Sequence, residues 1–255
     1  MDLHLPGPSR SIVRSVHTTG VTSVGGEPLV VVSAGETLFA LDAAMGRKVW
    51  SVAGRGFSAG RAACGGQRVY TAAADGYARA HDAATGKEVW SYQMASGDEF
   101  SLALHSGWGD VVALGDDVAI VAIVSRSYAL DAATGALRWT FSGSAMYAPT
   151  VVLRDATALF TTEYGVVSLV DLATGNTIWQ TSLDVRVFNA GAIVHENTAW
   201  IQSVDGKLIG LRITDGTRRG WPQHTLAFTF SSPAVVNNTL VVGDQDGVVH
   251  GIALP

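Results

Sequence analysis

Short apolar runs separated by turn residues recur along the whole chain. Residues 239–243 read Thr-Leu-Val-Val-Gly, and an Asp-Gly pair at 246–247 follows this run. Asp-Gly between alternating apolar segments is a strong hairpin signal, because the turn needs positive φ angles. The pair recurs at 75–76 and 205–206, and Tyr-Gly at 164–165 is a variant. The pattern therefore predicts a chain of short antiparallel strands joined by tight turns.

An eleven-residue phrase, Ala-x-Asp-x-x-Thr-Gly-x-x-x-Trp, is superimposed on these strands. It is complete at 80–90 and 129–139, slightly changed at 40–50 and 169–179, and degraded where it ends at Trp221. The repeats are about forty residues apart, and strand-rich repeats of this length are typical of β-propellers.

Each part of the phrase has a physical reason. An aspartate carboxylate can accept hydrogen bonds from backbone amides two or three residues later. The glycine allows a backbone conformation that a Cβ would disfavour. The tryptophan offers a large flat surface, and burying it between neighbouring blades would contribute roughly 2–3 kcal/mol. We therefore interpret the phrase as a turn followed by a strand that locks two blades together.

Five phrases and one partial repeat predict a six-bladed β-propeller of four-stranded antiparallel blades. The last repeat, 228–254, supplies only three strands, whereas 11–17 is strand-like and precedes the first repeat. We expect this N-terminal strand to complete the last blade and close the ring, because closure removes an exposed sheet edge. The alternative is an open last blade with a disordered leader. Either way, 1–255 is predicted to be a single domain with a flexible leader at 1–10.

Composition excludes several classes of protein. The 255 residues carry a net charge of −5 without any basic run, so nucleic-acid binding is disfavoured. There is no apolar stretch of about eighteen residues, so no membrane insertion is expected. Cys64 is the single cysteine, and the first residues lack the pattern of a signal peptide. These features together predict a cytoplasmic protein, or a periplasmic one if a leader has been removed.

The repeated phrase resembles the tryptophan-docking motif of the PQQ-like propellers, the family of quinoprotein alcohol dehydrogenases and of BamB-type assembly factors. The resemblance covers essentially the whole chain. It implies a pair of adjacent cysteines beside the quinone in the dehydrogenases, whereas Cys64 stands alone here. It implies a lipidation cysteine near the N-terminus in BamB-type lipoproteins, which this sequence lacks. We therefore expect no cofactor, no PQQ and no bound metal.

A longer connection between two repeats is the first candidate site. It follows Trp90 and contains Asp98, Glu99, His105 and Trp108. Inserted loops on a rigid scaffold often carry function. His105 and Glu99 are candidate acid and base residues, and Asp98 and Trp108 are candidate ligand contacts. A neutral loop that caps the channel is the alternative.

Arg61 is the second candidate, because the other repeats have small or apolar residues at its position. A buried arginine needs a partner. It is either an anion anchor near the channel mouth or one half of an inter-blade salt bridge with Asp98 or Glu99.

Further ligand-binding candidates come from the turns and loops that are expected at the same end of the channel. These residues are Phe57, Tyr147, Tyr164, Arg186 and Asn189. They can line a small-molecule pocket or form a protein contact surface. We therefore predict a soluble, non-redox binding or scaffold module for a protein or a small ligand. The alternative is a cofactor-independent lyase, cyclase or hydrolase with its pocket at the channel mouth.

Overall fold

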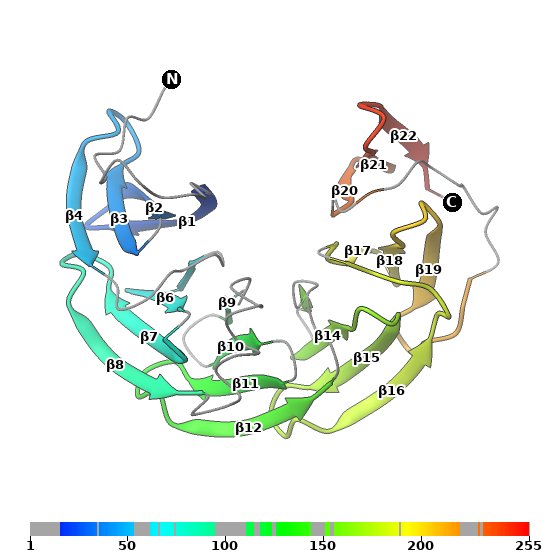
Figure 1. Ribbon diagram of the computed structural model, residues 1–255, viewed down its shortest axis with the longest axis horizontal. Coiled ribbons are helices and arrows are strands. Elements are labelled where there is room, and N and C mark those ends of the chain that lie inside the picture. Colours follow the sequence, from blue (N-terminus) through cyan, green and yellow to red (C-terminus); the bar gives the residue numbers. More distant parts are fainter. Residues whose placement is uncertain are drawn as a thin grey trace.

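Six separate antiparallel sheets follow one another along an arc in the computed structural model (Figure 1). The structure describes residues 16–34, 36–53, 62–65, 67–73, 75–94, 111–114, 118–123, 126–143, 151–153, 156–188, 190–219, 229 and 232–254. Strands and turns, without any helix, make up the regular structure of these residues. The all-β prediction is confirmed.

The first three sheets have four strands each. The first contains β1 (Val16–Val24), β2 (Glu27–Ala34), β3 (Thr37–Asp42) and β4 (Lys48–Ala53). The second contains β5 (Ala63–Gly65), β6 (Arg68–Ala72), β7 (Tyr77–Asp82) and β8 (Glu88–Gln93). The third contains β9 (Val111–Leu114), β10 (Val118–Ile123), β11 (Arg126–Asp131) and β12 (Leu137–Ser142).

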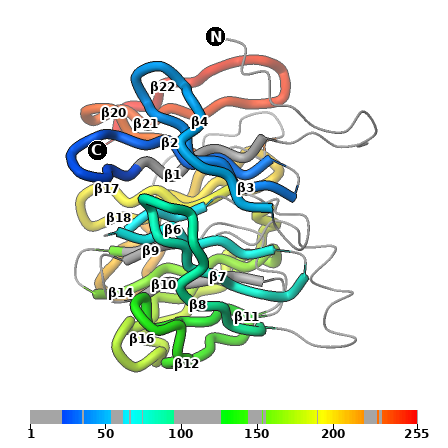
Figure 2. Tube along the Cα trace, turned by 90° about the vertical axis from the view of Figure 1, so that its left-hand side faces the viewer, coloured from blue at the N-terminus to red at the C-terminus, as the bar shows by residue number. Residues whose placement is uncertain are grey.

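The remaining sheets have four, three and three strands. The fourth contains β13 (Val151–Val152), β14 (Thr157–Thr161), β15 (Val166–Asp171) and β16 (Thr177–Ser182). The fifth contains β17 (Ile193–His195), β18 (Thr198–Gln202) and β19 (Leu208–Arg212), and the last contains β20 (Ala234–Val236), β21 (Thr239–Gly243) and β22 (Val249–Ala253). Consecutive strands pair within every sheet. Seen from the side, the second and third sheets lie as adjacent layers (Figure 2).

The N-terminal strand belongs to the first sheet. Val16 pairs with Ala34 and His17 with Ser33, as parts of the β1–β2 ladder. The two strands are joined by Gly25 and Gly26, which both have positive φ. A Gly-Gly pair is a favoured two-residue hairpin turn. The predicted transfer of this strand into the last sheet is therefore not found, and the first and last sheets lie apart at the two ends of the arc (Figure 1).

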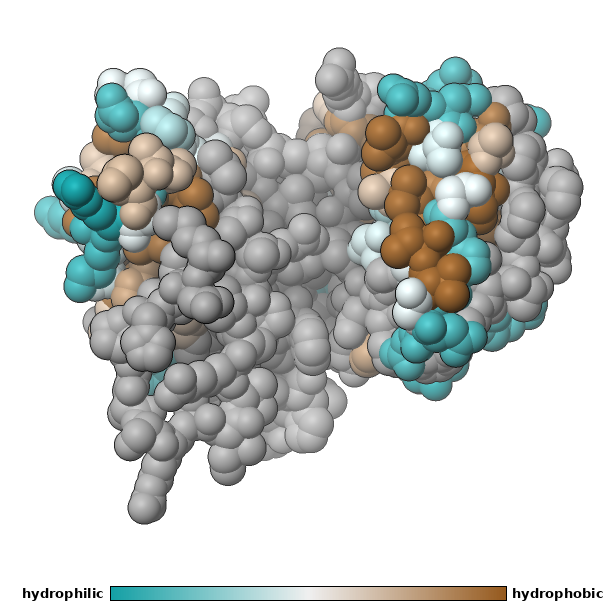
Figure 3. All heavy atoms as spheres, turned by 90° about the horizontal axis from the view of Figure 1, so that it is seen from above, coloured by the Kyte–Doolittle hydropathy of each residue, from teal (hydrophilic) through white to brown (hydrophobic). Residues whose placement is uncertain are grey.

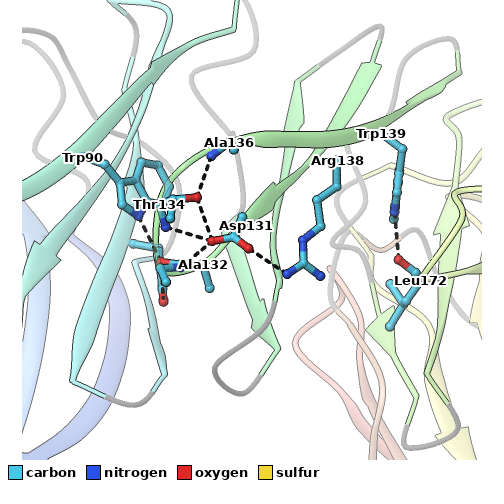
Figure 4. Close-up of polar contacts among 10 residues, drawn as sticks. Trp90, Asp131, Ala132, Thr134, Ala136, Arg138, Trp139 and Leu172 are labelled. Atoms are coloured by element: carbon cyan, nitrogen blue, oxygen red, sulfur yellow. Dashed lines mark hydrogen bonds and ion pairs between the residues drawn. The ribbon is translucent and has the colours of Figure 1, made fainter.

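Each of the four phrase tryptophans that the structure describes fastens its sheet to the next one; Trp221 lies outside the described residues. The indole Nε1 donates a hydrogen bond to a backbone carbonyl in the following sheet, at 2.7–3.0 Å in all four cases. The pairs are Trp50 with Ala83, Trp90 with Ala132, Trp139 with Leu172, and Trp179 with Ile213. Figure 4 shows the second and third of them. The predicted lock between neighbouring sheets is confirmed.

The aspartate of the phrase organises the turn on which the indole rests. Asp131 Oδ1 accepts hydrogen bonds from the Thr134 amide at 2.9 Å and the Thr134 hydroxyl at 2.8 Å (Figure 4). Arg138 donates to the other carboxylate oxygen at 2.8 Å. The Arg138 and Thr134 hydrogen bonds lower the pKa of Asp131 to about 2. The turn is therefore built on a carboxylate that stays ionised.

The glycine of the phrase lets the turn approach the indole. Gly135 has φ +75°, and a Cβ built on it would lie 2.6 Å from Trp90 Cδ2. Gly86 and Gly175 are in the same situation beneath Trp50 and Trp139. A larger residue at these positions would push the tryptophan away from its carbonyl.

The turn of the degraded fifth phrase still receives the indole of the fourth sheet, although an arginine and an aspartate have exchanged places in it. Arg212 stands where the other turns have aspartate, and its guanidinium pairs with Asp215 at 2.8 Å. Asp215 in turn accepts hydrogen bonds from the amide and hydroxyl of Thr217. Gly216 lies beneath Trp179, so the sheet junction is preserved although the sequence motif is not.

Candidate functional site

The turn between β14 and β15 is crossed by the linker that leaves the fourth sheet. The Leu183 amide donates to the Gly165 carbonyl, and the Val187 amide donates to the Glu163 carbonyl, both at 2.9 Å. Gly165 has φ +73°, and a side chain there would collide with the Val185 carbonyl. The local sequence thus fixes the linker against the turn.

Exposed and buried side chains alternate along this linker. Leu183 is 2% exposed and Val187 is fully buried, and both belong to the core beneath the fifth sheet. Asp184 and Arg186 point to solvent between them. The linker is therefore anchored by its apolar residues and presents its charged residues outward.

Arg186 forms an ion pair with Glu163 of the crossed turn. The Arg186 side chain is 65% exposed, whereas that of Glu163 is only 13% exposed. The exposed guanidinium is thereby oriented by a largely buried carboxylate. Tyr164, the next residue of the turn, is 62% exposed. The turn therefore carries an exposed aromatic residue directly after the residue that holds the Arg186 guanidinium.

A second arginine extends this surface on the other side of the linker. Arg218 donates to the Ser182 carbonyl at 2.9 Å and lies 3.4 Å from the Asp184 carboxylate. Ser182 Oγ donates to the same carboxylate. We call the group formed by Glu163, Tyr164, Asp184, Arg186 and Arg218 the Tyr164–Arg186 surface.

Backbone hydrogen bonds continue from this surface to the last sheet. The Val204 amide donates to the Arg186 carbonyl at 2.8 Å, and the Thr229 amide donates to the Val204 carbonyl at 3.3 Å. The Thr229 hydroxyl donates to the Gly243 carbonyl at 2.9 Å. Hydrogen bonds therefore connect the linker of this surface to the fifth and the last sheet.

Two of the ten site residues predicted from sequence lie within the described residues: Tyr164 on the β14–β15 turn, and Arg186 on the linker that crosses this turn. Glu163, which precedes Tyr164 in this turn, forms the ion pair with Arg186. The other eight predicted residues lie outside the described residues and stay predictions: Phe57, Arg61, Asp98, Glu99, His105, Trp108, Tyr147 and Asn189.

Two other groups with a lowered pKa in the described part of the chain have structural roles. His81 is buried, with Nδ1 3.2 Å from the Gly86 carbonyl oxygen, and burial lowers its pKa. It therefore stays neutral and supports the docking turn. Asp244 accepts hydrogen bonds from His250 and from backbone amides, which lower its pKa. Neither residue belongs to the Tyr164–Arg186 surface.

Comparison with known proteins identifies the family. The family model described as outer membrane protein assembly factor BamB matches residues 9–140 and 125–254. The chain belongs to the BamB family. A curated relative, outer membrane protein assembly factor BamB of Marinobacter adhaerens, is 35% identical over 92 residues. That match covers 34% of this chain and 22% of the relative, so this BamB-family chain spans about a fifth of the relative's length.

Solved structures show the same fold. BamB from Moraxella catarrhalis superimposes with a TM-score of 0.74 at 22% identity, over 94% of this chain and 74% of that chain. The computationally designed Ika8 protein gives 0.73 at 16% identity, covering 93% and 71%. Quinohemoprotein alcohol dehydrogenase from Comamonas testosteroni gives 0.68 at 17% identity, covering 94% and 46%. The predicted PQQ-like propeller family is confirmed.

Membership of the BamB family corrects the expected location. The family model and the curated relative are both outer membrane protein assembly factors. The prediction of a cytoplasmic protein is therefore wrong. That prediction relied on the lack of a signal-peptide pattern in the first residues of the chain, whereas family membership points to the outer membrane assembly process. Among the described residues there is no helix with the length and apolar character needed to cross a bilayer.

The adjacent cysteine pair that the resemblance implies for the quinoprotein dehydrogenases is absent from this BamB-family chain. The single cysteine, Cys64, lies half-buried in β5, where burial raises the pKa of its thiol to about 11. The described residues contain no group of three histidine, cysteine or acidic side chains that could hold a metal ion. The likeness to the quinohemoprotein dehydrogenase is therefore a likeness of fold.

Proposed function

We propose that this chain is a scaffold that binds a protein partner through the Tyr164–Arg186 surface, in the assembly of outer membrane proteins. The observation that carries the proposal is an exposed tyrosine on a turn whose preceding residue, Glu163, holds an exposed arginine of the crossing linker. Family membership suggests the process in which this partner is bound, because the relatives are named as outer membrane protein assembly factors. In this proposal each of the six sheets is one blade of a cofactor-free propeller.

The chemistry of the surface favours a protein over a small ligand. Tyrosine and arginine are enriched among the residues that contribute most to protein–protein binding. Tyr164 and Arg186 project into solvent. A small ligand would be held in a concave site instead. Glu163 offsets the arginine charge, so a partner can cover the pair without burying an unpaired cation.

The rigidity of the surface supports the same proposal. Leu183 and Val187 anchor the linker in the core, and the turn and linker share two backbone hydrogen bonds. A surface that is already ordered loses little conformational freedom on binding. The partner therefore gains affinity from side chains that are held in place beforehand.

Photo-crosslinking in the native host tests the proposal. A photoreactive phenylalanine analogue would replace Tyr164, and the same analogue at Ile178 provides the control. Ile178 is 53% exposed on β16 of the same sheet, but it lies outside the Tyr164–Arg186 surface. We expect position 164 to form an adduct with a component of the outer membrane protein assembly machinery, and position 178 to form none. The same adducts at both positions, or none at 164, would contradict the proposal.

A further inference from the structure

His81 stands at a position of the repeated phrase where the other sheets have an apolar residue. The position lies between the alanine and the aspartate, and its other occupants are Leu41, Leu130, Val170 and, in the degraded phrase, Leu211. These four side chains are buried, and His81 is buried as well, at 4% exposure. An imidazole therefore takes the place of a hydrocarbon side chain in the core of one sheet junction.

Both ring nitrogens of His81 face polar groups of the second sheet. Nδ1 lies 3.2 Å from the Gly86 carbonyl oxygen, and Nε2 lies 3.5 Å from Thr71 Oγ1. A carbonyl oxygen can only accept, so Nδ1 carries the proton of the neutral ring and Nε2 is the acceptor. The neutral imidazole therefore fits this site with one donor and one acceptor.

The hydrogen bond to Gly86 connects His81 to the docking of the first sheet. Gly86 has φ +73°, and a Cβ on it would lie 2.7 Å from Trp50 Cε3. The same indole donates to the Ala83 carbonyl at 2.8 Å. A displacement of the His81 ring would therefore move the turn on which Trp50 rests.

The second sheet surrounds His81 with charges that do not compensate its burial. Burial lowers the pKa of His81 below the ordinary value of 6.5, and Arg79 on the same strand acts in the same direction. Glu88, which is opposite His81 in the β7–β8 register, acts against them, but its side chain is 44% exposed and lies 3.6 Å from Arg79. Asp75 is already paired with the Arg79 guanidinium. A protonated ring would therefore be a poorly compensated cation.

The first sheet offers no counter-charge from the other side, as far as the described residues show. The core between the two sheets includes Val31, Leu38 and Trp50 of the first sheet. Cys64 at its margin has a pKa of about 11, because burial disfavours the thiolate, and so it stays neutral. Lys48, which shares the strand face of Trp50, is exposed and positive. The junction is therefore built for an uncharged imidazole.

The junction at Trp50 attaches the first sheet to its neighbour through this indole and the shared core. The described residues of the first and last sheets lie apart at the two ends of the arc (Figure 3). Among these residues, the last sheet therefore gives the first sheet no second attachment. Release of the Trp50 indole would loosen the first sheet as a whole.

We propose that protonation of His81 opens the junction between the first and second sheets in mild acid. The charged ring moves toward water, because an unpaired cation in the core is costly. Its Nδ1 leaves the Gly86 carbonyl, the turn shifts, and the Trp50 indole loses its support. The junctions of Trp90, Trp139 and Trp179 have a buried leucine or valine at this position and do not respond.

The direction of the effect follows from proton linkage. The pKa of His81 is lower in the folded chain than the ordinary 6.5, so the unfolded or opened chain binds the proton first as the pH falls. The stabilisation by the neutral ring is therefore fully present above pH 6.5, and it is lost as the pH falls from there through the folded-state pKa.

Fluorine NMR of the full chain labelled with 5-fluorotryptophan tests the proposal. Tryptophan-to-phenylalanine variants assign the resonances of Trp50, Trp90, Trp139 and Trp179. We expect the Trp50 resonance to shift as the pH is lowered from about 7.5 to about 5, and the other three to stay unchanged. The imidazole resonance of His81 should titrate with the same midpoint. A Trp50 resonance that does not respond to pH, or that titrates with a different midpoint from His81, would overturn the proposal.

Two histidine variants assign the response to His81. His81→Leu introduces the residue found in the third sheet, and His195→Gln is the matched control, because His195 lies in the fifth sheet and contacts Asn238. We expect the pH-dependent shift of the Trp50 resonance to disappear in His81→Leu and to persist in His195→Gln. The opposite result for either variant would overturn the assignment. The common midpoint of His81 and Trp50 needs only the unaltered chain, so it decides the question even if His81→Leu does not fold.

Discussion

Replacing Gly135 with alanine would place a methyl group against the indole of Trp90. The added Cβ would lie 2.6–3.0 Å from three indole carbons. The indole has little room to move, since it is 8% exposed, donates to the Ala132 carbonyl and lies 6.0 Å from the Tyr70 ring. The substitution therefore tests whether the sheets are held together by tight packing of tryptophan on glycine.

Two effects add to the cost of Gly135→Ala. The left-handed backbone at φ +75° costs an alanine roughly 1–2 kcal/mol. Forcing a methyl group into a packed junction costs a further 1–3 kcal/mol, approximately. The expected loss in the free energy of unfolding is thus about 2–5 kcal/mol.

Urea unfolding followed by circular dichroism measures this loss, and Gly25→Ala provides the control. Gly25 has φ +59° with nothing within 4 Å of an added Cβ, so it carries the backbone cost alone. The difference between the two variants, roughly 1–3 kcal/mol, is the contribution of the contact with Trp90. Equal losses for both variants would refute the reasoning, because the indole would then be free to give way.

Three other predictions follow from the same structure. Trp139→Ala should lower the free energy of unfolding by about 3–5 kcal/mol in urea titrations. A loss near zero would contradict the role of this indole in holding the sheets together. The ordinary aspartate pKa of 3.8 falls to about 2 for Asp131 in the folded chain, so the stabilisation is present above the ordinary value and disappears as pH falls toward 2. Asp131→Asn should accordingly lose stability at pH 7 but little at about pH 2 and below, and a pH-independent loss would contradict this. Cys64, whose pKa is about 11, should react with iodoacetamide at pH 8 far more slowly in the folded chain than in urea, and equal rates would contradict its burial.

The sequence predicted the parts of the fold that depend on local chemistry. The turn at Asp131 and the lock at Trp139 follow from residues a few positions apart, and both are confirmed. The turn at Arg212 was not predicted in detail, because arginine stands where the other turns have aspartate. The carboxylate that accepts the turn hydrogen bonds is that of Asp215 instead. Geometry is conserved there although residue identity is not.

Strand pairing over longer distances was harder to predict. A strand-like run at 11–17 can join either the first or the last sheet, and apolar pattern alone does not choose between them. The Gly25-Gly26 hairpin decides in favour of the first sheet for the part from Val16 onward. The hairpin at Gly25-Gly26 is a local signal, and the expected closure of the ring did not take it into account.

The candidate site was predictable only where the turn chemistry was clear. Tyr164 and Arg186 were expected at the same end of the channel, and Arg186 forms its ion pair with Glu163, the residue before Tyr164. The sequence could not show that the linker passes across the turn, because that contact depends on the Leu183 and Val187 anchors in the core.

The amount of folded outer membrane protein in the native host tests the proposed function most directly. The double variant Tyr164→Ala/Arg186→Ala would be compared with Ile178→Ala, at equal cellular levels of each chain. All three side chains are exposed, so none of the substitutions should unfold the chain. The account predicts that folded outer membrane proteins decrease in the double variant and stay unchanged in the control. Unchanged levels in the double variant would contradict a partner-binding role for the Tyr164–Arg186 surface.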